Sequence, residues 1–466
     1  MIMYKGFHFF TSQNKRRTIT DTTGKTPIRV LLISFHFPPM NVISAFRAEG
    51  FARYLPDHGM DVTVLTTTRD ARTGESTWYP QGTPVEHDTW ERCTVYRVPR
   101  YRSWYYRAVQ VSLEVPFWSA IVSFSHCVTG SFNLHLIDVH KGYKRFLKTH
   151  LRSNKYDVVI GTAPPDEHIA LGAWINKVSG TSFVADFRDL FDTRTLMATR
   201  APAWSERLIY RLKHLYHRRW ARHTAMHTTV SLPLLEKLME FVSGTQGVEI
   251  RNGYLPEKLN RDRTAIRRDR FCITYAGRIY PWQDVLPFTR AYRSFMGRLS
   301  RAEQATVDLR MYGCQDAGQI ALIKQELQGF DFRIEAKRVP ESENYHRIAE
   351  SAVLIVFDVG QHGGYTGKLM DYLGCHRHVL LLPTDQGVME RLIRDSNIGI
   401  GTKDIEIAAT QLERWFREWR VDGRPHFEGN EPIIEQGSRQ AQTARLAQAI
   451  TTMLAGQRQD LNRGLD

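Results

Sequence analysis

The sequence predicts an α/β fold of two Rossmann-like, doubly wound domains that face a cleft. Three observations support this prediction. The chain has 466 residues, more than the roughly 100–200 of one ordinary domain. Its 42% hydrophobic and 24% charged residues are typical of a soluble globular protein. Short apolar, β-branched runs alternate with helical patterns in two successive series, as in domains built on parallel sheets.

The first series predicts an N-terminal domain over residues 27–252, after a polar, basic leader at 1–26. A helical pattern from Ser44 to His58 stops at Gly59 and lies between the first two expected strands, which completes a βαβ unit. The strands are expected at IRVLLIS (28–34), DVTVLTT (61–67), YDVVIGT (156–162), TSFVADF (181–187), MHTTVS (226–231) and GVEIRN (247–252).

The second series predicts a C-terminal domain at 271–435, reached through a charged, turn-prone linker at 253–270. A helix and tail, 436–466, close the chain. Ligands of open parallel sheets bind outside the carboxyl ends of the strands, so the residues that follow each strand are candidates for a site. The strands are expected at FCITYAG (271–277), ATVDLRMYG (305–313), DFRIEA (331–336), AVLIVFD (352–358), VLLLP (379–383) and IGIG (398–401).

Composition limits where the protein works and what it binds. No apolar run reaches the roughly 18–20 residues that a membrane span needs. At the N-terminus aromatic residues precede the basic cluster, so we expect no export signal. Five scattered cysteines without C-x-x-C spacing indicate a reducing, cytoplasmic compartment and no zinc site. The net charge of +14 favours a phosphate-bearing partner: nucleic acid, acidic lipid or a nucleotide donor.

A glycine-rich turn between a buried strand and a helix, DVGQHGGYTGKLMDYL (358–373), is the strongest candidate site. A helix N-terminus after such a turn offers backbone N–H groups and a positive dipole end to a phosphate. Lys368 adds a charge, and Asp371 lies on the same helical face to accept hydrogen bonds from ribose hydroxyls. An exposed Lys–Asp pair after an ordinary loop is the alternative. The expected donor-binding residues here are Gly363, Gly364, Tyr365, Thr366, Gly367 and Asp371.

A second candidate follows the first strand of the C-terminal domain. Gly277 permits close approach of the backbone, and Arg278 is expected to project into the cleft. A guanidinium suits a diphosphate because it stays charged and donates two parallel hydrogen bonds. In a chain with 63 basic residues, an ordinary surface arginine is the alternative.

Polar residues after three strands of the N-terminal domain predict its share of the cleft. A Pro-Pro turn at 38–39 shapes one loop, and further carboxylates, a histidine and an arginine follow the strands at 156–162 and 181–187. The expected acceptor or cleft residues are Asn41, Arg47, His168, Asp186, Arg188 and Asp189. An Asp–Arg–Asp pairing that ties down the loop at 186–189 is the alternative.

Two stretches suit contact with an anionic membrane surface. Residues 101–128 mix Trp, Tyr and Arg with aliphatic residues, and their role stays open between membrane contact and core. Residues 203–222 form a basic, aromatic helix, for which a core-facing helix with a basic outer face is the favoured interpretation.

Taken together these segments resemble the family 4 glycosyltransferases of the GT-B fold, over nearly all of residues 28–455. The resemblance implies a retaining, metal-independent hexosyltransferase without a cofactor. Such an enzyme transfers a sugar from a UDP- or GDP-linked donor to a glycan or lipid-linked acceptor in polysaccharide biosynthesis. The matching segments are IRVLLISFHFPP, DVTVLT, DVVIGTAPP, DFRDLF, VSLPLLEKL, EIRNGY, ITYAGRIY and the stretch from VPESENYHRIAE to HVLLLP.

The same resemblance places the diphosphate against Arg278 and Lys368 as catalytic residues, and the ribose against Asp371, where the family usually has glutamate. Two positions depart from the family. Gly363 stands where a second glutamate is usual, eight residues before Asp371, and Gln283 stands where a lysine is common.

Two other functions fit parts of the sequence. A GT-B-fold sugar-nucleotide epimerase or hydrolase would use the same diphosphate site. A nucleic-acid-binding protein is suggested by charge alone, and no helix-turn-helix, zinc finger or RNP-type strand accompanies that charge, so we expect no nucleic-acid partner.

Overall fold

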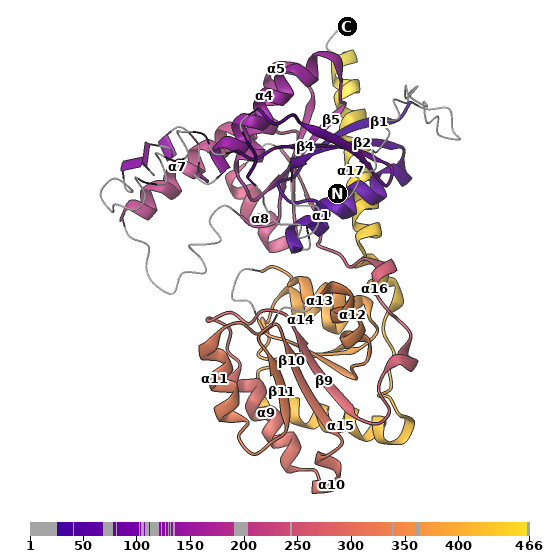
Figure 1. Ribbon diagram of the computed structural model, residues 1–466. Helices are drawn as coiled ribbons and strands as arrows, with labels where there is room; N and C mark the ends of the chain where they lie inside the picture. Colours follow the sequence, from indigo (N-terminus) through magenta and orange to yellow (C-terminus); the bar gives the residue numbers. More distant parts are fainter. Residues whose placement is uncertain are drawn as a thin grey trace, which may run out of the picture.

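The computed structural model places two parallel-sheet domains one above the other (Figure 1). It describes residues 26–463 apart from 41, 69–77, 81, 102, 104–106, 108–110, 112–120, 123, 126, 129, 131, 134–135, 191–203, 243–244, 338–339 and 359–362. Residues 1–25 of the predicted leader lie outside the described residues, and Thr26, its last residue, is described. The predicted fold class is confirmed.

The N-terminal domain holds an eight-stranded sheet in the order β3-β4-β2-β1-β5-β6-β7-β8. All neighbouring strands run parallel except β3 and β4, which pair antiparallel. The strands are β1 (Ile28–Ile33), β2 (Met60–Thr67), β3 (Glu86–Trp90), β4 (Cys93–Val98), β5 (Val158–Ala163), β6 (Ser182–Phe187), β7 (Met226–Thr229) and β8 (Gln246–Glu249). The helices around them are α1 (Ile43–Tyr54), the 3-10 helix η1 (Leu55–His58), α4 (Ile137–Ser153), α5 (Glu167–Ser179), α7 (Trp204–Ala221) and α8 (Leu232–Phe241).

The edge hairpin of this sheet, β3 and β4, was not among the expected strands. β3 has little apolar pattern, because four of its five residues are exposed at the sheet edge. Antiparallel pairing joins its Trp90 to Cys93 across a two-residue turn in which Glu91 has φ +51°. A polar edge strand is held by backbone pairing to its neighbour, and hydrophobic periodicity does not reveal it.

The C-terminal domain holds a six-stranded, fully parallel sheet in the order β11-β10-β9-β12-β13-β14. The strands are β9 (Phe271–Ala276), β10 (Val307–Tyr312), β11 (Phe332–Glu335), β12 (Val353–Val356), β13 (His378–Leu381) and β14 (Gly399–Gly401). The helices are α9 (Leu286–Gly297), α10 (Arg301–Gln304), α11 (Ala317–Glu326), α12 (Glu341–Ala349), α13 (Gly367–Gly374), α14 (Val388–Asp395), α15 (Ile405–Asp422) and α16 (Glu431–Gln436). Every residue of β9, β10, β12 and β13 is buried, as expected for strands covered on both faces.

The last helix, α17 (Arg439–Arg463), returns to the N-terminal domain (Figure 1). Its Leu446 and Ile450 are fully buried in the core beside β1 and β2. Gly50 of α1 allows the approach, because a Cβ at that position would lie 3.1 Å from Cδ of Arg439. The chain therefore passes between the domains twice, and the closing helix packs on the domain in which the chain began.

The two crossings run side by side. Tyr254 N–H donates to the carbonyl of Gly437 at 3.2 Å, and Arg439 N–H donates to the carbonyl of Tyr254 at 2.8 Å. The predicted linker contains two short 3-10 helices, η3 (Pro256–Lys258) and η4 (Arg263–Ala265). Pairing of the two strands of chain gives the connection between the domains a defined path.

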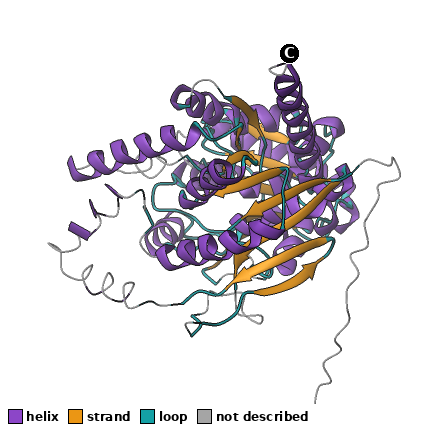
Figure 2. Cartoon of the chain, turned by 90° about the horizontal axis from the view of Figure 1, so that it is seen from above, coloured by secondary structure: helices purple, strands orange, loops and turns teal. Residues whose placement is uncertain are grey.

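Helix α7 reaches beyond the N-terminal domain, as both overall views show (Figures 1 and 2). None of the helices in the described part of the chain is both apolar enough and long enough to cross a bilayer.

Candidate functional site

A cleft of about 720 Å³ lies between the two domains. It receives residues that follow β6 and β8 of one sheet and β9 and β10 of the other, together with α1, α12, α13 and α17. This is where the carboxyl ends of parallel strands present their loops, the usual ligand position in such sheets. Of the expected site residues, those that line the cleft are Arg47, Arg188, Asp189, Gly277, Arg278, Tyr365, Gly367, Lys368 and Asp371.

The C-terminal wall is built around Gly277. Its φ of +124° is one that side-chain-bearing residues rarely adopt, and its N–H donates to the carbonyl of Tyr312 at 2.7 Å. A Cβ at Gly277 would lie 2.4 Å from Cε of Lys368. The glycine is therefore needed twice, for the turn after β9 and for the passage of the lysine stem.

Lys368 is the second residue of α13, and its side chain passes over Gly277 and lines the cleft. Its Nζ donates to the carbonyl of Arg278 at 3.1 Å and lies 5.0 Å from the ring centroid of Tyr275. Burial lowers the pKa of Lys368 to about 8, while the nearby charge of Asp371 opposes that shift. An arriving anion would favour the protonated lysine and add a second opposite charge to that of Asp371.

Arg278 lines the cleft and is exposed. The guanidinium carbon lies 5.1 Å from the ring centroid of Tyr280, whose ring stacks on Trp282 at 4.7 Å. A cation held over an aromatic face keeps its charge and its donors available. Arg278 and Lys368 thus bring two cationic groups to one end of the cleft.

Gln283, the residue at which a departure from the expected pattern was noted, has a structural role. The residue is buried, accepts from the Tyr280 N–H at 2.9 Å, and donates to the carbonyl of Asp358 at 3.2 Å. It closes the loop that carries Arg278 and ties it to the end of β12. A lysine there would leave a charge in this buried position, so the glutamine fits this loop.

The glycine-rich turn divides between the cleft and the opposite domain. Thr366 caps α13 by accepting from the Leu369 N–H at 3.1 Å, and Gly367 lines the cleft. Gly363, with φ +64°, faces α8: a Cβ there would lie 2.8 Å from Cβ of Pro233. Gly364 also faces α8. Gly363, Gly364 and Thr366 are therefore not in the cleft lining, and a glutamate at 363 would collide with the other domain.

On the N-terminal wall, Arg47 and Asp186 neutralise each other. Arg47 Nε and Nη2 donate to the carboxylate of Asp186 at 2.9 and 2.6 Å, and Arg47 Nη1 donates to the carbonyl of Ile250 at 2.8 Å. Asp186 also accepts from the hydroxyl of Thr228 at 2.6 Å and is fully buried. The prediction of Asp186 as a cleft residue is wrong, because its carboxylate lies beneath the wall and holds Arg47.

The prediction of His168 as a cleft residue is also wrong. Its side chain is fully buried, one ring nitrogen lies 3.0 Å from the carbonyl oxygen of Thr162, and its ring stacks on Tyr143 with 5.8 Å between centroids. Burial places its pKa well below the ordinary value, so the imidazole is neutral. It packs the start of α5 against α4. Asn41 lies outside the described residues.

Arg188 and Asp189 reach the cleft from the end of β6. Arg188 donates to the carbonyls of Ala163 and Pro164, and burial lowers its pKa from the ordinary value. Asp189 is exposed. Arg188 thus ties down its loop through main-chain carbonyls, which differs from the Asp–Arg–Asp pairing given above as the alternative.

Two cationic residues of the cleft were not predicted. Arg251, which follows β8, lies 5.2 Å from the ring centroid of Tyr365, and its position after a predicted strand could have revealed it. Arg439, at the start of α17, donates to the carbonyl of Gly253 at 2.7 Å and lies over Phe46. Nothing in the sequence indicates that α17 returns to the cleft.

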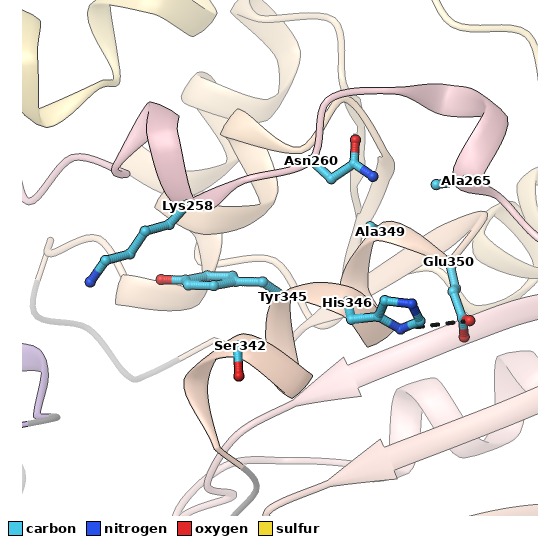
Figure 3. A pocket seen from close by; sticks show the side chains of 8 residues that line it. All are labelled: Lys258, Asn260, Ala265, Ser342, Tyr345, His346, Ala349 and Glu350. Atoms are coloured by element: carbon cyan, nitrogen blue, oxygen red, sulfur yellow. Dashed lines mark ion pairs between the residues drawn. The ribbon is translucent and has the colours of Figure 1, made fainter.

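A second cavity of about 560 Å³ lies on the C-terminal domain beside the linker (Figure 3). Tyr345 of α12 belongs to the lining of both cavities. Lys258 and Tyr345 point to one side of it, and His346 pairs with Glu350 at 3.7 Å on the other. Lys258 already pairs with Glu49 at 3.4 Å. The interdomain cleft gathers more positive charge and both sheet edges, so it is the better candidate.

No protein-family model matches the sequence, and no curated protein matches it. Solved structures do. A sucrose-phosphate synthase from Thermosynechococcus elongatus has a TM-score of 0.54 and 12% identity, over 94% of this chain and 99% of that one. An α,α-trehalose-phosphate synthase (UDP-forming) from Burkholderia xenovorans, in complex with glucose-6-phosphate, has a TM-score of 0.55 and 12% identity, over 91% and 100%.

A third structure, described as trehalose-6-phosphate from E. coli bound with UDP-2-fluoro glucose, has a TM-score of 0.52 and 9% identity, over 93% of this chain and 98% of that one. The fold is GT-B. At this level of identity the likeness concerns the fold. In the GT-B frame, β9 and α13 bring Gly277, Arg278 and Lys368 to one wall, and β6, β8 and α17 form the other.

Proposed function

We propose that the protein is a glycosyltransferase that transfers a sugar from a nucleotide-sugar donor. The observation that carries the proposal is the convergence of Arg278, Lys368 and the start of α13 around Gly277, in the cleft of a GT-B fold. A nucleoside diphosphate leaving a sugar develops negative charge, and a cleft with two cations and a helix N-terminus can stabilise it. The similar structures described above include UDP-forming and UDP-sugar-bound proteins, which supports a nucleotide donor.

Each residue has a part in this proposal. Arg278 and Lys368 bind the diphosphate and stabilise the leaving group, and Asp371, one turn into α13, accepts from the ribose. Tyr365 and Gly367 border the donor. Arg47 shapes the acceptor side, with Arg188, Asp189, Arg251 and Arg439 nearby. In a retaining transfer, the bond between the anomeric carbon of the sugar and the donor's phosphate oxygen breaks as the acceptor oxygen bonds to that carbon on the same face. An oxygen of the departing nucleoside diphosphate accepts the proton of the acceptor hydroxyl.

The finer features are part of the same proposal. The donor is UDP- or GDP-linked, the reaction proceeds with retention and without a metal, and the acceptor is a glycan or lipid-linked glycan of cell-surface polysaccharide synthesis. The resemblance to family 4 glycosyltransferases supports these features. A lipid-linked acceptor would place the enzyme on the inner face of a membrane, as a cytoplasmic, peripheral protein.

A thermal-shift screen of nucleotide sugars tests the proposal. A donor that binds the native cleft raises the melting temperature by mass action. The shift should disappear in Lys368→Met and persist in Lys258→Met, which removes a lysine from the neighbouring cavity. If no nucleotide or nucleotide sugar shifts the wild-type protein, the proposal fails. Donor turnover that needs no acceptor would instead indicate the epimerase or hydrolase.

A further inference from the structure

Helix α7 exposes a continuous stripe of basic and apolar side chains. Trp204 is 79% exposed and Leu215 is 60% exposed. Spacings of three and four residues place the stripe on one helical face. Its members on α7 are Trp204, Arg207, Arg211, Leu215 and Arg218, and Arg222 follows directly after the helix; all are exposed.

The opposite face of α7 packs on the domain. His217 and Trp220 are buried, and Lys213 Nζ donates to Asp166 at the start of α5 at 2.8 Å. The packed face fits the interpretation of 203–222 as a core-facing helix with a basic outer face. That interpretation did not include the exposed Trp204 and Leu215 on the outer face.

A second stripe lies alongside. Ile121, Phe124 and Val128 are 43%, 46% and 48% exposed, and their spacing places them on one helical face. The hydroxyl of Tyr216 on α7 donates to the carbonyl of Val128, and a Cβ at Gly130 would lie 2.7 Å from the Tyr216 ring. The two stripes therefore belong to one surface. Trp104, Tyr105, Tyr106 and Trp118 lie outside the described residues.

We infer that this surface, the outer face of α7 with Ile121, Phe124 and Val128, docks on an anionic lipid bilayer. Of the eleven large hydrophobic side chains exposed in the described ranges, five lie in these two stripes: Ile121, Phe124, Val128, Trp204 and Leu215. Anionic headgroups attract arginines, and apolar side chains with an exposed Trp suit the interface beneath them. Helix α7 reaches past the body of the domain, where it can meet a flat surface (Figures 1 and 2).

Charge and apolarity together select the lipid surface over other partners. Nucleic acid would use the arginines and leave Phe124, Trp204 and Leu215 in water. A second copy in a two-fold interface would bring arginines of α7 against each other, which repels. The inference rests on the proposed function in one respect: the docked domain is the one that would hold a lipid-linked acceptor.

Vesicle co-sedimentation of the full chain tests the inference, with phosphatidylcholine alone and with equal parts of phosphatidylglycerol. Binding should require phosphatidylglycerol and fall as salt rises. Arg211→Gln with Arg218→Gln should weaken it roughly twentyfold, since each arginine contributes about fivefold near an anionic surface. The matched control is Arg414→Gln with Arg420→Gln on α15 of the other domain, which should bind like the wild type.

An apolar pair of variants separates docking from simple charge attraction. Trp204→Ser with Leu215→Ser should weaken binding on the order of tenfold, whereas Ile407→Ser with Val421→Ser on α15 should not. Equal loss in test and control variants would reduce the effect to net charge and overturn the inference. The inference would also be overturned if the wild-type protein did not bind anionic vesicles at low salt, or if it bound only nucleic acid. A dimer detected by light scattering and lost in the α7 variants would overturn it as well.

The thermal shift with nucleotide sugars, measured on the same variants, keeps the two proposals apart. The α7 variants should retain the wild-type shift, because α7 contributes nothing to the cleft lining. Vesicle binding without any nucleotide response would leave the docking surface standing and remove the glycosyltransferase. A nucleotide response without vesicle binding would support the glycosyltransferase and remove the docking surface.

Discussion

The two walls of the cleft contain the same kinds of residue and use them in opposite ways. On the N-terminal wall, Arg47 is 4% exposed and its donors meet the carboxylate of Asp186 and a main-chain carbonyl. On the C-terminal wall, Arg278 is exposed, and Lys368 donates to a main-chain carbonyl while Asp371 acts on it through space. An arginine saturated by its own protein holds chain segments together, whereas cations with donors still directed outward can receive an anion.

A position at the carboxyl end of a parallel strand does not by itself decide whether a residue binds ligand or holds the fold. Asp186 and Gly277 both stand at the carboxyl end of a parallel strand. Asp186 is sealed under the wall, while Gly277 opens a passage for a lysine. This difference predicts that substitutions on the N-terminal wall lower stability, whereas substitutions on the C-terminal wall lower turnover.

The largest expected effect is on the N-terminal wall. Asp186→Asn leaves Arg47 buried without its counter-charge, which should lower the free energy of unfolding by about 3–5 kcal/mol. Urea denaturation measures it. Arg47→Met combined with Asp186→Leu removes both charges and should recover a large part of the loss. If Asp186→Asn keeps the wild-type stability but abolishes turnover, the Arg47–Asp186 pair is catalytic. The two walls would then not differ in the way described.

On the C-terminal wall, Arg278→Ala and Lys368→Ala should each reduce turnover roughly a hundredfold or more, as loss of a donor to developing charge does. Their melting temperatures should stay near that of the wild type, because neither side chain is part of a buried ion pair like Arg47. Steady-state kinetics and thermal melts check both halves. Lys258→Ala is the control. Near-normal turnover in both cleft variants would remove these residues from the mechanism.

A smaller effect is expected from pH. The pKa of Lys368 is about 8 in the unliganded cleft, and a bound diphosphate favours the charged form and raises it. Between these two pKa values binding takes up a proton, so donor affinity is highest below pH 8. It should fall as pH rises, by up to about tenfold per pH unit. Calorimetric titration with the nucleoside diphosphate across this range measures it.

The matched variant for the pH series is Lys368→Met, whose affinity should be low and should not change across the same interval. An identical pH profile in the wild type and in Lys368→Met would assign the titration to another group.

The smallest effect is expected from metal removal. In the proposed reaction, Arg278 and Lys368 supply the positive charge that a divalent ion supplies to the leaving group in other transferases, so chelator should leave turnover unchanged. The measurement is turnover before and after dialysis against chelator. Activity that vanishes and returns with a divalent ion would contradict the metal-independent reaction.

Much of the fold follows from the sequence because local patterns encode it. The short apolar run at 271–276 favours a strand covered on both faces, and parallel strands need crossover connections, which are usually helices. The strand-end rule then placed Gly277 and Arg278 correctly in the cleft, and the glycine-rich entry to α13 placed Lys368 there.

The tertiary structure alone decided which charges are consumed internally. Arg47 and Asp186 are separated by 139 positions in the chain, and only packing of α1 against β6 joins them. The return of α17, which brings Arg439 to the cleft, and the exposure of Trp204 on α7 are likewise results of packing. Periodicity reports which face of a segment is apolar. Which neighbour covers that face, and whether any does, depends on contacts between distant parts of the chain.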